Sequence, residues 1–150
     1  MNRLAIAIAF ALSSLGYLAL AQNLPNGNGK DITEEVCGSC HVSSYILSRG
    51  RATRAEWVEL VDAMIAFGST ADQKQIQATK DYLTKTFGKV NVNEAPSAEI
   101  SDVLGITPSQ ADAIVAYRTE HGAFKTISDL KNVAGLDSAN LDSKRDRVGF

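Results

Sequence analysis

Five consecutive residues, Cys37-Gly38-Ser39-Cys40-His41, hold both cysteines of the chain and one of its two histidines. Two thiols that lie two residues apart on a helical turn can reach both vinyl groups of a porphyrin, and the next residue can bring an imidazole to the iron. The same spacing occurs in thiol-disulfide redox pairs, and it permits a disulfide in an exported protein. A thioredoxin-like pair follows a strand, however, and no strand pattern precedes Cys37. The motif therefore favours one covalent haem c on Cys37 and Cys40, with His41 as a ligand of the iron.

The haem iron also needs a sixth ligand or an open site, and the chain offers Met64 and His121 as candidates outside the motif. Met64 falls on an apolar helical stripe between Trp57 and Phe67, where a core methionine and a haem-facing methionine look alike. His121 lies at a predicted helix C-terminus, a position that suits an imidazole because of the helix dipole. A thioether opposite histidine raises the reduction potential, which suits electron transfer. We therefore expect His41 and Met64 as the axial ligands of the iron.

The overall composition is that of a globular protein, with 150 residues of which 45% are hydrophobic and 21% charged. Fifteen basic and 17 acidic side chains give a net charge of -2, so the total charge does not direct the chain to nucleic acid or anionic membranes. With two cysteines and two histidines, a four-ligand structural zinc site would use every soft ligand of the chain. Wholesale disorder and collagen-like structure are excluded.

The first 21 residues have the pattern of an export signal. A positive charge at Arg3 precedes an apolar run over residues 4–12, and residues 19–21 form the small-x-small site that signal peptidase accepts. An uncleaved membrane anchor is the alternative, although the apolar span is short for a bilayer and is interrupted by polar residues. We expect cleavage after Ala21, a periplasmic protein without stable membrane insertion, and a flexible lead-in over residues 22–29.

Beyond the lead-in, the sequence predicts an all-α protein of two units, residues 30–88 and residues 89–150, because no stretch shows sustained period-two alternation. Glycines at positions 68 and 88 end two amphipathic helices of the first unit. Their apolar stripes contain Trp57, Leu60, Val61, Met64 and Phe67, and then Ile76, Tyr82, Leu83 and Phe87. A core of about sixty residues rarely supplies more than ~3–5 kcal/mol without a metal or covalent link, so a covalent haem would also stabilise this unit.

The pattern changes in the second unit to short helices punctuated by glycine. Two helix-turn-helix hairpins are predicted, and the last helix is expected over residues 138–147. The two turns are Gly105-Ile106-Thr107 and Gly135-Leu136-Asp137.

Several motifs of the first unit form a shared pattern, namely Leu24-Pro25-x-Gly27-x-Gly29-Lys30, Cys37-x-x-Cys40-His41, Arg54-x-x-Trp57, Met64-x-x-x-Gly68 and Tyr82-Leu83. With this pattern, residues 24–88 resemble the small cytochrome c domains that accompany periplasmic quinoprotein and molybdenum dehydrogenases. The resemblance implies ligation of the iron by His41 and Met64, and single-electron transfer rather than enzymatic bond chemistry. Three nearby arginines are candidate partners for haem propionates or for a partner's acidic rim, unless they form a solvated charged turn; these are Arg49, Arg51 and Arg54.

The second unit carries a different set of motifs: Lys89 to Ala95, Leu104-Gly105-Ile106, Ala116-Tyr117-Arg118, His121-Gly122-x-Phe124 and Asp129-Leu130. With these motifs, residues 89–148 resemble the tandem helix-hairpin-helix domain of bacterial competence DNA receptors. In that family, a Gly-hydrophobic-Gly turn lets backbone N–H groups approach a phosphate. Thr107 and Asp137 occupy the second glycine positions here, and each can cap the helix that follows with its own oxygen. Asp137 also places a negative charge where a phosphate would lie.

The charge of the second unit also bears on its partner. Residues 89–150 contain 7 basic and 9 acidic side chains, a net charge of -2, and the basic cluster Lys144-Arg145-Arg147 is interleaved with aspartates. DNA binding gains most of its free energy from the neutralisation of phosphates, so DNA is disfavoured. We expect a periplasmic c-type cytochrome whose second unit docks a redox protein or dehydrogenase. The alternatives are a haem-tethered receptor for DNA binding or DNA uptake, and a thiol-disulfide enzyme.

Overall fold

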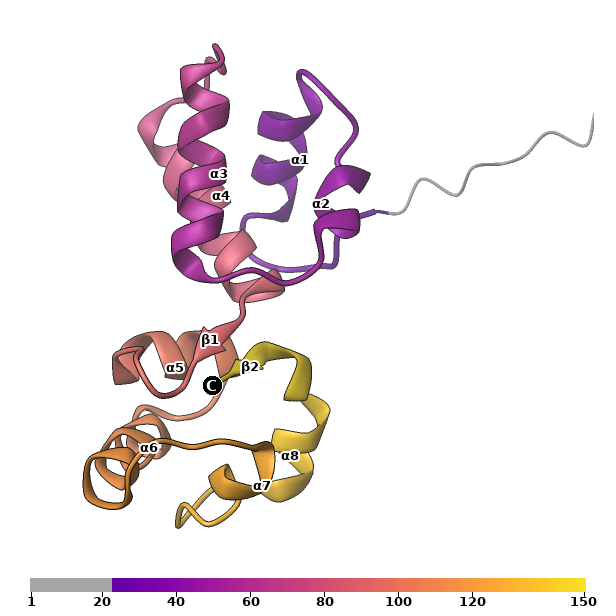
Figure 1. Ribbon diagram of the computed structural model, residues 1–150. Helices are drawn as coiled ribbons and strands as arrows, with labels where there is room; N and C mark the ends of the chain where they lie inside the picture. Colours follow the sequence, from indigo (N-terminus) through magenta and orange to yellow (C-terminus); the bar gives the residue numbers. More distant parts are fainter. Residues whose placement is uncertain (1–22) are drawn as a thin grey trace, which may run out of the picture.

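The computed structural model describes residues 23–150 (Figure 1). The predicted signal peptide at residues 1–21 and its cleavage after Ala21 therefore lie outside the described residues. The described chain forms two helical lobes, each with its own hydrophobic core; the all-α protein that the sequence predicts is found as a mostly helical fold with two short strands. Within residues 23–150, no helix is long and apolar enough to cross a membrane.

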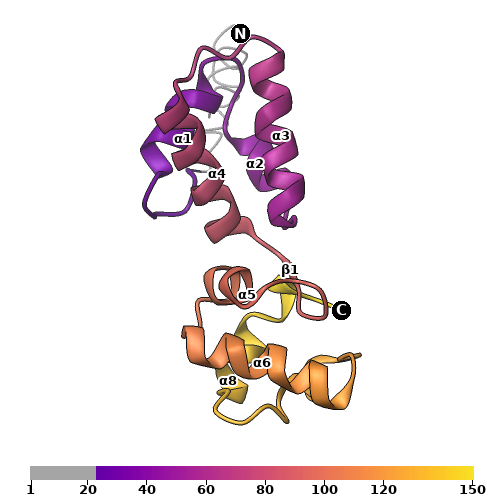
Figure 2. The same ribbon diagram turned by 90° about the vertical axis from the view of Figure 1, so that its left-hand side faces the viewer.

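The first lobe is organised around its fourth helix, which packs against both the first and the third (Figure 2). Its helices are α1 (Lys30–Gly38), α2 (Ser44–Arg49), α3 (Arg54–Ala66) and α4 (Gln73–Phe87). Helices α3 and α4 both begin with a capping box, in which Thr53 and Asp72 satisfy backbone N–H groups of the first turn. The buried apolar side chains of the core come from α2, α3 and α4 and from the segments before α1 and α3; they are Leu24, Ile46, Ala52, Trp57, Val61, Ile76, Tyr82 and Leu83.

The segment before α1 is packed against the lobe. Leu24 is only 2% exposed, and its backbone N–H donates to Glu34 Oε1 at 3.2 Å. The Tyr82 hydroxyl of α4 donates to Pro25 O at 2.6 Å. Leu24 and Pro25, at the start of the described part of the expected lead-in, are therefore held against the lobe, whereas residues 25–28 are exposed.

The second lobe begins and ends with a short strand. Its elements are β1 (Val90–Asn91), α5 (Ser97–Leu104), α6 (Pro108–His121), α7 (Ile127–Leu130), α8 (Ser138–Ser143), the 3-10 helix η1 (Arg145–Arg147) and β2 (Val148–Gly149). The strands pair in parallel, with Val90 opposite Val148. Two-residue strands are too short to show alternation, so the sequence predicted neither of them. The last helix stops at Ser143, not at residue 147 as predicted, since Lys144 leaves the helical conformation.

Both predicted hairpins are formed in the second lobe. Helices α5 and α6 are joined through Gly105, and α7 and α8 through Gly135; these glycines have φ angles of 56° and 83°. Positive φ favours glycine, which explains why each turn contains one. The buried core between the hairpins and the strands consists of apolar side chains from every element but η1: Val90, Val92, Ile100, Val103, Leu104, Ala111, Ile114, Phe124, Leu130, Val133, Leu141 and Val148.

The joint between the lobes is short and hydrogen-bonded. The Ala52 N–H donates to Phe87 O at 3.1 Å, and the Lys89 N–H donates to Ala52 O at 2.8 Å. The Trp57 indole N–H also donates to Phe87 O at 3.2 Å. The segment between α2 and α3 is therefore bonded to the end of α4, where the chain leaves for the second lobe.

Two arginines from different lobes meet at the C-terminus of α4. Arg51 Nη1 and Arg147 Nη2 both donate to Thr86 O, at 3.0 and 2.8 Å. Arg147 Nη1 also donates to Val103 O at 2.7 Å, and Arg51 pairs with Asp146. Cationic donors satisfy the free carbonyl groups of a helix C-terminus and interact favourably with its dipole. Arg147 therefore joins the lobes and is not part of an exposed basic patch.

We expect Arg147→Ala to lower the free energy of unfolding by about 2 kcal/mol, because charged hydrogen bonds contribute roughly 1.5–3 kcal/mol and the carbonyl groups would lose a donor. Chemical denaturation of the full chain measures this change. The control is Arg145→Ala, since Arg145 is exposed and makes no ion pair within the described residues. A surface substitution of that kind should change the free energy by less than ~0.5 kcal/mol. Equal effects of the two substitutions would contradict the role of Arg147.

Candidate functional site

The cysteine motif lies at the C-terminal end of α1, where the backbone makes one further turn. The N–H groups of Cys40 and His41 both donate to Cys37 O, at 3.4 and 3.3 Å. The Ser39 hydroxyl donates to Val36 O at 2.8 Å and holds the same turn. As a result, the two thiols and the imidazole of this short segment face a common space.

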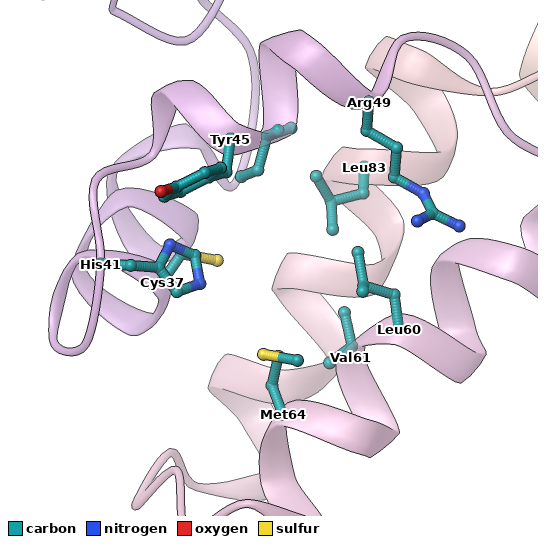
Figure 3. Close-up of a pocket in the computed structure, with 9 residues that line it drawn as sticks. Cys37, His41, Tyr45, Arg49, Leu60, Val61, Met64 and Leu83 are labelled. Carbon is teal, nitrogen blue, oxygen red and sulfur yellow. The ribbon is translucent and has the colours of Figure 1, made fainter.

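Met64 closes that space from the opposite side. Figure 3 shows Met64 extending from α3 toward Cys37 and His41, with the apolar side chains of Val61, Leu60 and Leu83 beside it. The cavity between these residues has a volume of about 230 Å³. Its walls are predominantly apolar, and Arg49 stands at one end.

A second cavity of about 190 Å³ adjoins the first and shares Cys37, His41, Val61 and Met64 with it. Cys40 and Thr79 line this second cavity. We call the two cavities together the Cys–Met pocket. The structure therefore brings all four predicted haem-binding residues, which span positions 37 to 64, to the walls of one pocket.

The mouth of the Cys–Met pocket carries large apolar side chains that are exposed. Tyr45 lines the first cavity and is 65% exposed, and Phe67 lines the second and is 84% exposed. The Tyr45 ring stands edge-on to the His41 imidazole, with ring centroids 5.5 Å apart, and His41 Nδ1 lies 3.2 Å from Val42 O. The His41 ring is thus oriented by neighbours on its own segment.

The environment of Cys37 is not that of an activated thiol. Burial raises the pKa of the Cys37 thiol above its usual value, because desolvation disfavours the thiolate. Cys37 also lies in the last turn of α1, where the helix dipole disfavours a negative charge. Reactive redox thiols show the opposite, a lowered pKa at a helix N-terminus.

The other predicted site residues are dispersed. His121 lies at the end of α6 in the second lobe, against the Tyr117 ring at 4.3 Å, and does not line the Cys–Met pocket. Of the three arginines, Arg49 alone lines the pocket, with its guanidinium 5.5 Å from the centre of the Trp57 ring. The other two are bound elsewhere: Arg51 to the joint and Arg54 to Asp81 at 3.6 Å.

The two hairpin turns carry the caps that their sequences predict. The Thr107 hydroxyl accepts the Gln110 N–H at 3.2 Å, and Gln110 Oε1 accepts the Thr107 N–H at 3.0 Å. In the second hairpin, Asp137 Oδ1 accepts the Ala139 N–H at 2.9 Å. Side-chain oxygens therefore accept hydrogen bonds from backbone N–H groups. With glycine at positions 107 and 137, these N–H groups would be free to bind a phosphate.

The two turns lie next to each other. Gln110 Nε2 of the first hairpin donates to Gly135 O of the second at 2.8 Å. In the reverse direction, Lys144 Nζ lies 3.4 Å from Gly105 O. Because of these two contacts, the turns lie on the same face of the lobe, and the ammonium group of Lys144 lies beside the first turn. The sequence shows Lys144 within a basic cluster but gives no sign that it reaches the other hairpin.

Comparison with known proteins assigns the second lobe to a family. Residues 85–148 match the family described as "Helix-hairpin-helix motif". An uncharacterized protein of Haemophilus influenzae is 33% identical over 105 residues, which cover 62% of this chain and 94% of that protein. The second lobe is a helix-hairpin-helix domain. No solved structure matches the chain significantly.

Two further relatives match part of the chain. ComE operon protein 1 of Bacillus subtilis is 37% identical over 59 residues, 39% of this chain and 29% of that protein. Endonuclease/exonuclease/phosphatase family domain-containing protein 1 of Bos taurus is 30% identical over 110 residues, 65% of this chain and 19% of that protein. The chain thus spans less than a third of the length of these two curated relatives.

These relationships change the balance between the functional interpretations. The relation to ComE operon protein 1 supports the resemblance of the second lobe to competence receptors, so the alternative that includes DNA is better supported than the docking module we expected. The resemblance of residues 24–88 to small cytochrome c domains stays a prediction. Within residues 23–150, no three side chains of His, Cys, Asp or Glu are grouped so as to hold a metal ion.

The thiols provide a direct test of the pocket geometry. In protein made without haem, Cys40 should be alkylated by iodoacetamide faster than Cys37, because Cys40 is exposed and Cys37 is partly buried. Since the pKa of Cys37 is raised, its reaction rate should keep increasing with pH above the usual thiol value of about 8.5. Rates for Cys40→Ser and Cys37→Ser, followed by mass spectrometry against pH, separate the two thiols. Rapid modification of Cys37 at neutral pH would indicate an activated redox thiol instead.

Proposed function

We propose that the chain is a haem-tethered DNA-binding protein of the periplasm. The first lobe carries one covalent haem c and exchanges single electrons, and the helix-hairpin-helix lobe binds duplex DNA without reading its sequence. The observation that carries the haem assignment is the convergence of Cys37, Cys40, His41 and Met64 on one apolar pocket. The DNA assignment rests on membership of the helix-hairpin-helix family and on the relation to ComE operon protein 1.

The donor set and the walls of the Cys–Met pocket fit a haem. Two thiols on one turn suit thioether links to the porphyrin, and an imidazole and a thioether face each other across the pocket. The walls are apolar, and exposed Tyr45 and Phe67 extend the apolar surface at the mouth, where a flat apolar group would cover them. The hydroxyl of Thr79, which lines the pocket, is buried without a hydrogen-bond partner.

Each residue then has a defined task. Cys37 and Cys40 attach the haem, and His41 and Met64 hold its iron, which supplies one-electron redox chemistry when bound. Val61, Leu83 and the other apolar walls exclude water, which favours the less charged state of the site. Arg49 is the arginine placed to meet a propionate, since Arg51 and Arg54 are bound to other groups. We propose no bond-making chemistry and therefore no enzymatic activity.

A thiol-disulfide enzyme is the weaker assignment for the same residues. Such an enzyme needs a thiol whose pKa is lowered, and burial raises the pKa of Cys37. The cysteines also end a helix that no strand precedes within the described residues.

DNA would bind on the face that the two hairpin turns share. The ammonium group of Lys144 is the donor that the structure places there, with Arg145 beside it in sequence. Two features limit the affinity: Asp137 adds a negative charge, and Arg118 and Arg147 are engaged with backbone carbonyl groups. We therefore propose weak, non-specific binding through few phosphates, with a dissociation constant of about 10⁻⁴ to 10⁻⁶ M at physiological salt.

We expect the haem to appear in the intact mass. Full-length protein produced in cells competent for cytochrome c maturation should be recovered from the periplasm with the mass of residues 22–150 plus one haem. The Cys37→Ser/Cys40→Ser protein should lack that added mass. Recovery of an apo mass with free thiols or an internal disulfide would falsify the haem assignment, and an intact N-terminus in the membrane fraction would show an anchor rather than a signal peptide.

The axial ligand can be tested in the same preparation. Met64→Ala should remove the thioether-to-iron absorption band and lower the reduction potential, because the thioether would no longer hold the iron. His121→Ala is the matched control and should change neither, since His121 lies in the other lobe. An unchanged spectrum in Met64→Ala would exclude this residue as a ligand.

For DNA we expect a low salt dependence as well as weak affinity. If two or three phosphates are contacted, the slope of log K against log salt should be about -2 to -3, by the relation of about 0.9 per phosphate. Lys144→Ala/Arg145→Ala should abolish binding, measured by fluorescence titration of the full chain with duplex DNA. The matched control is Lys74→Ala/Lys85→Ala, which removes two exposed charges from α4 and should retain at least half of the affinity.

A second substitution tests the hairpin turn itself. Asp137→Gly removes the carboxylate and the competing cap, so it should strengthen DNA binding; a glycine cap itself costs only a few tenths of a kcal/mol in stability. If the wild-type chain and Asp137→Gly both fail to bind DNA at low salt, the DNA assignment is wrong, and a protein-docking module becomes the favoured assignment. The net negative charge and the side-chain caps are the observations that favour this second candidate.

A further inference from the structure

We propose that the Thr79 hydroxyl donates a hydrogen bond to the thioether sulfur of Met64 when the Cys–Met pocket is filled, and that it thereby positions this ligand. The inference rests on the proposed haem function and names a residue that neither the sequence motif nor the family resemblance singles out. It would make Thr79 a positioning residue that tunes the reduction potential.

The observation behind it is a buried hydroxyl without a partner. Thr79 lies in α4 with no exposed surface, and its Oγ1 atom makes no hydrogen bond. A helical threonine commonly donates to the carbonyl group one turn earlier, as Thr119 does to Val115 O at 2.8 Å. Because a buried hydroxyl without a partner is destabilising, Thr79 calls for an acceptor, and the described residues do not supply one in their present positions.

The acceptor follows from the walls of the pocket. Thr79 lines the cavity that it shares with Met64, His41 and the two cysteines. A bound porphyrin uses its four nitrogen atoms for the iron and offers no acceptor on its face, and an imidazole that holds the iron has no free lone pair. A thioether sulfur keeps a second lone pair after it binds a metal, and it is a weak acceptor. We assign the bond to Met64 Sδ; a bond to the sulfur of Cys37 or Cys40, which line the same cavity, would instead leave the thioether-to-iron band of Thr79→Val unchanged.

The hydrogen bond has a predictable electronic effect. A sulfur that accepts a hydrogen bond donates less electron density to the iron. The oxidised state of the iron is then less stabilised. The Thr79 hydroxyl should therefore raise the reduction potential. Two other threonines provide controls, because Thr33 and Thr84 are also buried with unpaired hydroxyl groups but do not line the Cys–Met pocket.

The experiment compares valine substitutions, which keep the shape of threonine and remove the hydroxyl. In haem-free protein, Thr79→Val and Thr33→Val should both raise the melting temperature, because each removes a buried unpaired group. In haem-loaded protein, Thr79→Val alone should lower the reduction potential and shift the thioether-to-iron band, and Thr33→Val and Thr84→Val should leave both at their wild-type values. Thr79→Ser keeps the hydroxyl and should restore the wild-type potential.

The outcomes separate this inference from the proposed function. A wild-type protein that carries haem with a thioether band, but whose potential is the same in Thr79→Val, overturns the role of Thr79 and leaves the haem assignment intact. A wild-type protein without haem overturns both. If Thr79→Val does not fold, Thr79→Ala is measured instead, and an unchanged potential there likewise overturns the inference.

Discussion

The packing of α1 and α3 against α4 is the interaction on which the rest of the structure depends. Helix α1 ends in the cysteine turn and α3 carries Met64 near its end, so contact with a common third helix places Met64 across the pocket from the cysteine turn. The same α4 supplies Thr79 to the pocket wall. At its C-terminus, carbonyl groups receive donors from Arg51 and Arg147, and so α4 also fixes where the second lobe begins.

The pocket and the joint between the lobes are connected by a short series of contacts. Arg49 lines the Cys–Met pocket and lies over the Trp57 ring, and the Trp57 indole donates to Phe87 O at the joint. Two residues after Arg49, Arg51 reaches across to Asp146 of the second lobe. Only a few side chains therefore separate the wall of the Cys–Met pocket from the helix-hairpin-helix lobe.

The helix-hairpin-helix lobe combines the family's fold with its own turn chemistry. Gly105 and Gly135 keep the positive φ that the hairpin needs, whereas Thr107 and Asp137 replace free backbone amides by side-chain caps. Such caps stabilise short helices and compete with a phosphate for the same N–H groups. The lobe thus retains the hairpin geometry while its electrostatics limit how strongly it can hold DNA.

Local patterns in the sequence were enough for the features that depend on neighbouring residues. The spacing of Cys37, Cys40 and His41, the glycine turns, and the caps at Thr107 and Asp137 are set by residues within one or two helical turns, and the structure places them as expected. Membership of the second lobe in its family likewise followed from short motifs.

Contacts between residues far apart in the chain were decided only by the tertiary structure. Arg51 and Arg147 look like surface charges in the sequence, yet they share a carbonyl group of α4, because the last carbonyl groups of a helix need donors from outside the helix. Lys144 reaches the turn of the other hairpin, and Thr79 becomes buried on a pocket wall. No local pattern encodes these positions. The burial of a side chain and the hydrogen-bond partners within its reach depend on which helices pack together, and the packing of the whole chain determines that.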